Sequence, residues 1–252
     1  MTTHKRLLRV LRFGPVLLAL AWVGVAVPSL QAQDYTAGRK AMVEEIRAET
    51  GSGFGQAGTG PLEPKVLEAL GTVPRHELVP ERLRDRAYLN RPLPIGYGQT
   101  ISQPYIVAYM THLLQPETGD VMLEVGTGSG YQAAVLAELV DHVYSIEIIP
   151  ELAQRATKDL ERLGYDNVTV RQGDGYYGWE EHAPYDGIVV AAAASHIPPA
   201  LVQQLKPGAR LVIPLGGPFA TQQLTLVEKT SDGKVKTRQL LPVSFVPLTG
   251  EH

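Results

Sequence analysis

The chain has 252 residues, of which 44% are hydrophobic and 19% are charged, and its formal net charge at pH 7 is −3. This length suits one large globular domain with an appendage, and the weak negative charge gives no electrostatic reason to expect nucleic-acid binding. The absence of cysteine excludes disulfide bonds, thiolate catalysis and cysteine-ligated metals. The seven histidines show no spacing typical of metal ligands, so no metal is expected.

The first 32 residues follow the three-part plan of a secretory signal peptide. An uncharged apolar run, 14–27, is followed by small residues that end at Ala32, a plausible last residue before cleavage. The basic residues that precede this run are Lys5, Arg6, Arg9 and Arg12. The run is short for a spanning helix, which needs roughly 20 residues, although a retained anchor is the alternative. We therefore predict a signal peptide over 1–32 and a periplasmic or secreted domain over 33–252, without stable membrane association after cleavage.

Residues 33–118 are predicted to form N-terminal helices and an active-site loop. Apolar residues at helical spacing predict helices within 34–50, 61–70 and 105–114, with a short helical piece that begins at Val73. Residues 51–60 contain five glycines and no charge, which predicts a flexible loop. Residues 91–104 contain three prolines and two glycines, so we expect no regular structure there. Long irregular segments in compact domains are often functional.

The next segment predicts a strand, a tight loop and a helix. The mostly apolar run 121–125 leads into a turn with glycine at Gly126, Gly128 and Gly130, and a helix-like run, 131–140, follows. Glycine permits positive φ angles and a close approach of a ligand to the backbone, and the first turn of a helix offers unpaired N–H groups. This combination is typical of a nucleotide-like ligand at the carboxyl end of a parallel strand.

The loop is not typical of a phosphate-binding site. Tyr131 stands where a dinucleotide fingerprint has its last glycine, and no Gly-Lys-Ser/Thr sequence follows. Ser129 lacks the flanking glycines of a nucleophile elbow. Glu147 ends the next apolar run and can accept both ribose hydroxyls of an adenosine, and a phosphate-free cationic ligand tolerates Glu124 nearby. S-adenosyl-L-methionine meets these conditions, and the alternative is a glycine-rich turn in another α/β protein.

The remaining chain alternates between strands and helices. Short apolar runs predict strands, and longer amphipathic runs predict helices. The predicted strands are 143–146, 168–171, 185–191 and 211–214, the predicted helices are 150–163 and 199–205, and 223–228 with 239–246 form a closing antiparallel pair. This alternation predicts an α/β domain with a doubly wound, mostly parallel sheet over 119–252.

Several motifs together resemble those of one family, the protein-L-isoaspartate (D-aspartate) O-methyltransferases. The glycine loop is shared with methyltransferases in general, whereas Thr-Ile-Ser-x-Pro at 100–104 is specific to this family. The motifs are Leu93–Gly96 with Gln99–Pro104, Leu123–Tyr131, Gly173–Gly175, Pro184–Asp186, Leu205–Gly208 and Phe245–Thr249. The resemblance covers about residues 42–249 and implies a Rossmann-like, S-adenosylmethionine-dependent methyltransferase fold.

The resemblance also implies the reaction. Family members move a methyl group from S-adenosylmethionine to the free α-carboxylate of L-isoaspartyl and D-aspartyl residues in damaged proteins. The ester then closes to a succinimide, which opens partly to normal aspartate. A peptide carboxylate with a pKa near about 4 is already ionised at pH 7, so no general base is needed. The implied partners are isoaspartyl peptides and proteins, and we expect a monomer.

The family resemblance assigns roles to individual residues. Ser102 would orient the substrate carboxylate, although a helix N-cap is an alternative role for a serine here. Glu147 would bind the ribose, with a solvated carboxylate as the alternative. Asp174 and the Gly175 backbone would meet the adenine amino group, with a plain Asp-Gly turn as the alternative. The expected donor-binding residues are Gln99, Thr100, Ile101, Ser102, Glu124, Gly126, Gly128, Gly130, Glu147, Asp174, Gly175 and Thr249.

Two other functions remain compatible with the sequence. A methyltransferase that acts on a small molecule would keep the glycine loop but would not need Thr100, Ile101 and Ser102. An exported protein that binds the donor without catalysis would keep the fold alone.

Overall fold

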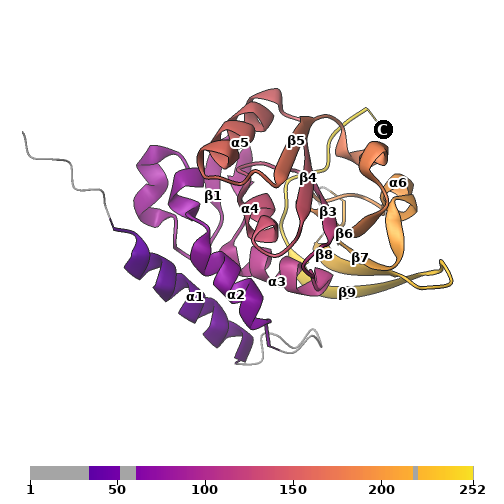
Figure 1. Ribbon diagram of the computed structural model, residues 1–252, viewed down its shortest axis with the longest axis horizontal. Helices are drawn as coiled ribbons and strands as arrows, with labels where there is room; N and C mark the ends of the chain where they lie inside the picture. Colours follow the sequence, from indigo (N-terminus) through magenta and orange to yellow (C-terminus); the bar gives the residue numbers. More distant parts are fainter. Residues whose placement is uncertain (1–33, 52–60, 218–220, 252) are drawn as a thin grey trace, which may run out of the picture. The chain divides into compact units, whose positions relative to one another are not determined.

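The computed structural model describes residues 34–51, 61–217 and 221–251 (Figure 1). The predicted signal peptide and nearly all of the glycine-rich segment 51–60 lie outside these ranges. The described residues belong to one compact unit, 34–252. Among the residues that the structure describes, no helix combines the length and the apolar character needed to cross a bilayer.

A seven-stranded sheet with the order β5-β4-β3-β6-β7-β8-β9 forms the centre of the described chain. Its strands are β3 (Val121–Val125), β4 (His142–Glu147), β5 (Val168–Gln172), β6 (Tyr185–Val190), β7 (Leu205–Leu215), β8 (Gln222–Lys229) and β9 (Val235–Val243). The first five strands in this order are parallel, and β8 and β9 complete the sheet antiparallel. The chain winds outward from β3 in both directions, so the strand order reverses beside β3, where doubly wound sheets bind ligands. The predicted sheet is confirmed.

Helices cover the sheet because alternate strand residues face opposite layers. Met122 joins the core that contains α3 (Pro104–Leu114), α4 (Tyr131–Ala137) and α5 (Pro150–Arg162). Leu123 faces the other way, into a second core beneath shorter elements. Those elements are α6 (Pro199–Gln203) and the 3-10 turns η3 (Gly175–Tyr177) and η4 (Glu180–His182). Both faces of the central strands β3 and β6 are therefore buried, as expected for parallel strands inside a sheet, whereas the edge strand β5 is partly exposed.

The N-terminal elements add buried side chains to the first of these cores. They are α1 (Thr36–Gly51), α2 (Pro64–Thr72), η1 (Arg75–Leu78) and η2 (Glu81–Arg86). The fully buried Arg75 donates from Nε to the Ala87 carbonyl at 2.7 Å, and its guanidinium carbon lies 4.5 Å from the centre of the Tyr131 ring. Tyr131 begins α4, so Arg75 connects the N-terminal region to the helix that follows the glycine loop.

The expectation of no regular structure in 91–104 is wrong. This segment contains an antiparallel hairpin of β1 (Leu93–Gly96) and β2 (Gln99–Ile101). Its two-residue turn has positive φ at both Tyr97 (54°) and Gly98 (71°), as in hairpin turns that match the twist of the strands. Pro94 is tolerated because a two-stranded ribbon has free edges, where a residue without an N–H group breaks no ladder.

Two strand boundaries also differ from the predicted ones. β7 begins at Leu205 and continues through Lys206-Pro207-Gly208, which we expected to end a helix and not to lie within a strand. The β6–β7 register shifts between Tyr185 and Gly187, and proline is accepted at such irregularities. β9 spans 235–243 in place of the expected 239–246, because the pairing with β8 extends its exposed, polar start.

Candidate functional site

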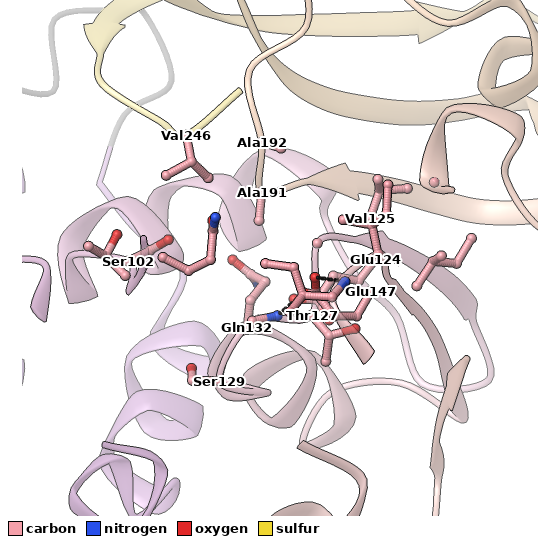
Figure 2. A pocket seen from close by; sticks show the side chains of 18 of the residues that line it. Ser102, Glu124, Val125, Thr127, Ser129, Gln132, Glu147, Ala191, Ala192 and Val246 are labelled. Atoms are coloured by element: carbon pink, nitrogen blue, oxygen red, sulfur yellow. Dashed lines mark hydrogen bonds between the residues drawn. The ribbon is translucent and has the colours of Figure 1, made fainter. Parts of the chain in front are cut away.

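A pocket lies at the carboxyl ends of β3, β4 and β6, beside the reversal in strand order (Figure 2). Five segments that are distant in sequence form its walls. They are 99–102 from the hairpin, 124–129 from the glycine loop, 146–149 after β4, 191–192 after β6 and 246–249 near the C-terminus, with Val107, Tyr131, Gln132 and Gly175 completing the lining. Most of the predicted donor-binding residues therefore meet in one place.

The glycine loop approaches the pocket with its backbone. Gly126 has a φ of 94°, and its N–H donates to the Ile146 carbonyl of the neighbouring strand at 2.8 Å. A Cβ atom on Gly126 would lie 3.5 Å from the Ala191 backbone, on the pocket wall. Gly130 has a different role, because it does not line the pocket and a Cβ atom there would lie 3.1 Å from Leu160. The prediction that Gly130 lies beside the donor thus gains no support from the geometry.

Glu124 is a completely buried carboxyl group that lines the pocket. The Ser145 hydroxyl donates to Oε2, and the Thr127 and Ser145 hydroxyls lie 2.5 Å apart. Oε1 is left without a well-formed hydrogen bond in the described residues. Burial raises the pKa of Glu124 to about 8, and this rise is reinforced by the charge of Glu147 and opposed by the Ser145 hydroxyl and the nearby Ala133 N–H. A buried oxygen that lacks a hydrogen bond favours the binding of a ligand that brings an N–H or O–H group or a positive charge to this position.

Glu147 is held by the backbone around it. Its Oε2 accepts from the Gly128 N–H at 2.7 Å and its Oε1 from the Ile149 N–H at 3.0 Å. The side chain is buried at 5% relative exposure, so it is not the solvated carboxylate of the alternative reading. Each carboxylate oxygen can accept more than one hydrogen bond, so Glu147 can still receive a pair of hydroxyl groups from a ligand.

Ser102 lies on the wall between the pocket and a second cavity. Figure 2 shows it on the far side of the pocket from Glu124 and Glu147. The second cavity is lined by Pro92, Thr100, Ser102, Gln103, Ile106, Ala191 and residues 242–246. The alternative role as a helix cap does not hold, since α3 begins at Pro104 with Gln103 as its N-cap and without a side-chain cap bond.

The adenine-side prediction is met only in part. Gly175 and Thr249 line the pocket, whereas Asp174 does not. The Asp174 carboxylate accepts from the Tyr176 N–H at 3.0 Å and from the Glu251 N–H at 3.3 Å, so it caps η3 as the alternative turn reading expects. A Cβ atom on Gly175 would lie 2.3 Å from Val125, so the chain can pass here only with glycine.

Several residues that line the pocket were not predicted from the sequence. Thr127 joins the hydroxyl chain to Glu124, and Gln132 lies in the first turn of α4, where its amide donates to the Thr111 hydroxyl at 2.8 Å. Ala191 and Ala192 follow β6, and their small side chains leave room at the pocket wall. The run of four alanines after a predicted strand was the available signal for this opening.

Comparisons with known proteins agree on the family. The family model described as Protein-L-isoaspartate(D-aspartate) O-methyltransferase matches residues 57–252. The chain is 59% identical over 237 residues to protein-L-isoaspartate O-methyltransferase 2 of Syntrophobacter fumaroxidans, covering 94% of this chain and 96% of that protein. It is 62% identical over 212 residues to protein-L-isoaspartate O-methyltransferase 2 of a Polaromonas species, covering 84% and 97%.

Solved structures agree on the fold. A protein-L-isoaspartate O-methyltransferase matches with a TM-score of 0.73 at 27% identity, over 84% of this chain and 66% of that one. A Plasmodium falciparum protein, solved with S-adenosyl-L-homocysteine, matches with a TM-score of 0.68 at 24% identity, over 84% and 98%. The sheet and its helices are therefore those of a methyltransferase fold.

Proposed function

The chain belongs to the protein-L-isoaspartate(D-aspartate) O-methyltransferase family, and on this premise we propose how its residues carry out the reaction. The enzyme transfers a methyl group from S-adenosyl-L-methionine to the free α-carboxylate of L-isoaspartyl and D-aspartyl residues in damaged proteins. The observation that carries the site assignment is the position of Ser102. This serine, from the family-specific Thr-Ile-Ser segment, lies where the donor pocket meets a second cavity.

The donor pocket fits the chemistry of S-adenosylmethionine, which supplies a methyl group on a sulfonium centre. Glu147 accepts the ribose hydroxyls while two backbone N–H groups hold its carboxylate in place. The ionised form of Glu124, whose Oε1 lacks a well-formed hydrogen bond, attracts the positive charge of the donor. Gly126 and Gly128 allow a close approach to the backbone. Asp174 meets the adenine amino group only if its carboxylate turns from its present contacts.

The acceptor side needs orientation and no proton transfer. An isoaspartyl carboxylate is ionised at neutral pH, and the Ser102 hydroxyl donates a hydrogen bond that fixes its direction. Alignment of two reactants can lower the activation free energy by roughly 7–11 kcal/mol. This agrees with the second cavity beside Ser102, whose lining among the described residues contains no carboxylate or histidine.

A methylation assay on matched peptides tests this function. We expect the purified protein to add one methyl group to an isoaspartyl peptide and none to the same peptide with normal aspartate, as followed by mass spectrometry. Methylation of neither peptide, with donor binding retained in calorimetry, would support a non-catalytic binding protein. A preference for small carboxylic acids over the isoaspartyl peptide would support the small-molecule alternative.

We further propose that the domain acts outside the cytoplasm, in the periplasm or after secretion, as a monomer without stable membrane association. The support is the order of basic, apolar and small residues in 1–32. Export creates a requirement, because the methyl donor is made in the cytoplasm and nothing in this sequence transports it. An external supply of donor is therefore part of the proposal.

A further inference from the structure

One short segment borders both cavities of the site. Residues 246–249 line the donor pocket, and residues 242–246 line the cavity on the other side of Ser102. Val246 belongs to both linings, and Figure 2 shows it beside Ala191 and Ala192 at the edge of the donor pocket. The backbone position of this segment therefore affects the shape of both cavities at once.

Regular strand pairing holds this segment only in part. β9 ends at Val243, where Gln222 is its last partner in β8. Further along, the Ala193 N–H donates to the Val246 carbonyl and the Leu248 N–H to the Ala193 carbonyl, both at 2.8 Å. Between these two anchors the chain passes through Phe245, which no main-chain ladder reaches in the described residues.

The side chain of Gln222 fills this gap in the pairing. Its Oε1 accepts from the Phe245 N–H at 2.6 Å, and its Nε2 donates to the Phe245 carbonyl at 3.0 Å. The amide thus replaces the two hydrogen bonds that a neighbouring strand would supply. Gln222 is itself buried at 9% relative exposure, so water does not readily compete for these bonds.

We propose that Gln222 is a positioning residue for methyl transfer, acting through Phe245 and Val246 on the wall shared by the donor and acceptor cavities. It touches neither substrate, because it lies in neither lining. The inference rests on the proposed function, since the shared wall has a catalytic meaning only if both cavities are occupied in turnover.

A Gln222→Glu variant provides a test that a merely structural role would not pass. A neutral glutamic acid can accept from the Phe245 N–H and donate to the Phe245 carbonyl, as glutamine does. An ionised glutamate can only accept, so it faces the carbonyl with a like partial charge. Burial favours the neutral form and raises the pKa of such a group, which places the change within the pH range of an enzyme assay.

The measurement is kcat/KM for an isoaspartyl peptide between pH 5.5 and 8.5, given as the ratio of variant to unaltered chain at each pH. This ratio cancels the titration of Glu124 and other shared groups. We expect a loss of about tenfold or more at pH 8.5, from one buried hydrogen bond replaced by repulsion, and recovery toward the unaltered value at low pH. Gln222→Met should lose activity at every pH, because it keeps the size and removes both bonds.

Gln223→Glu is the matched control, because the next residue of a strand points to the opposite face of the sheet. It should give a ratio that does not vary with pH. The proposal is overturned if Gln222→Glu keeps a flat ratio near one, or if its loss is the same at all pH values and follows a lowered melting temperature. If the proposed function itself is wrong, the result is different, because the unaltered chain would then not methylate the peptide.

Discussion

At the scale of single residues, the two glutamates of the donor pocket differ in how the protein holds them. Glu147 receives two backbone N–H groups at 2.7 and 3.0 Å. Glu124 is completely buried with one oxygen unpartnered, and its pKa is raised to about 8. They are therefore expected to respond differently to substitution.

Replacing Glu147 by alanine should weaken donor binding. Two ribose hydroxyls would lose a charged acceptor, which is worth roughly 1.5–3 kcal/mol or about 10- to 150-fold in affinity. Isothermal calorimetry with S-adenosylmethionine measures this. The exposed Glu161 of α5 is the matched control, and its replacement by alanine should leave the affinity unchanged. An unaltered dissociation constant for Glu147→Ala would remove Glu147 from the site.

Donor affinity should rise with pH because of Glu124. Its raised pKa means that the carboxyl is mostly protonated at pH 7, and a cationic donor prefers the ionised form. Affinity should increase between pH 6 and 8 by up to about tenfold per unit and level off above. Glu124→Gln should abolish the part of this slope that Glu124 causes. An identical slope in the variant contradicts this role.

The same raised pKa also makes the stability of the fold depend on pH. Stability should fall as the pH rises, whereas donor affinity should increase. The folded protein keeps a proton that the unfolded chain releases above the ordinary value of 4.5. The stabilisation from this proton is fully present below pH 4.5 and is lost as the pH rises through about 8. Glu124→Gln should therefore lose less stability than the unaltered chain as the pH rises from about 4.5 to 8, as measured by urea unfolding.

Replacing Ser102 by alanine should lower turnover far more than donor affinity. The hydroxyl is assigned to the acceptor carboxylate, so its loss should reduce kcat/KM for the isoaspartyl peptide by about 10- to 100-fold. Ser195, which is exposed and lies in neither cavity lining, is the control. Full turnover in Ser102→Ala would show that the orienting role is wrong.

At the scale of elements, the β1–β2 hairpin positions Ser102, which directly follows β2. The turn of this hairpin is strained at Tyr97. Tyr97 adopts a φ of 54° although its side chain is 57% exposed and bulky. Residues other than glycine, asparagine and aspartate pay a steric cost in this conformation. The hairpin therefore holds its geometry through the pairing of residues 93–96 with residues 99–101 and through contacts such as the Arg155 bond to the Ile95 carbonyl at 2.8 Å.

Replacing Tyr97 by asparagine should stabilise the protein. Asparagine tolerates positive φ and is favoured in this turn, so we expect roughly 0.5–1 kcal/mol more unfolding free energy in urea denaturation. Tyr177 is similarly exposed at 55% and has no positive φ, and Tyr177→Asn should give no gain. A loss of stability in Tyr97→Asn would mean that the tyrosine ring makes a contribution larger than the backbone strain.

At the scale of the whole molecule, topology decides where the site can form. β3 lies between β4 and β6 in the sheet, so the carboxyl ends of three strands that are distant in sequence open onto one pocket. Asp186 at the start of β6 accepts from the Val121 N–H at 2.9 Å and pairs with Lys206 at 2.7 Å. These contacts join β3, β6 and β7 near the amino ends of β3 and β6, away from the chemistry.

Export is the prediction that concerns the molecule as a whole. The basic residues before the apolar run 14–27 should keep that end in the cytoplasm, so that the domain emerges on the other side. Cell fractionation followed by N-terminal sequencing should find a mature chain that starts near Gln33 in the periplasmic fraction or the medium. An intact Met1 terminus in the cytoplasmic fraction would show that the segment is not a signal peptide.

The amino-acid sequence by itself determined the family, the alternation of strands and helices, and the glycine loop between Glu124 and Tyr131. These features depend on short-range patterns, such as glycine spacing and apolar periodicity, that can be recognised within about ten residues. The position of Glu147 at the end of a strand followed in the same way. The family and the doubly wound sheet are confirmed, while the roles of Ser102, Glu147 and Asp174 stay predictions.

Only the tertiary structure decided which distant segments line the same pocket. The β1–β2 hairpin was not predicted, because its pairing depends on a turn at Tyr97 and Gly98 and not on periodicity. The sequence also does not show that Glu124 is buried with one oxygen lacking a well-formed hydrogen bond, or that Gly130 lies against Leu160. Burial, pKa and hydrogen-bond partners arise from contacts between residues far apart in the chain, so local patterns do not contain them.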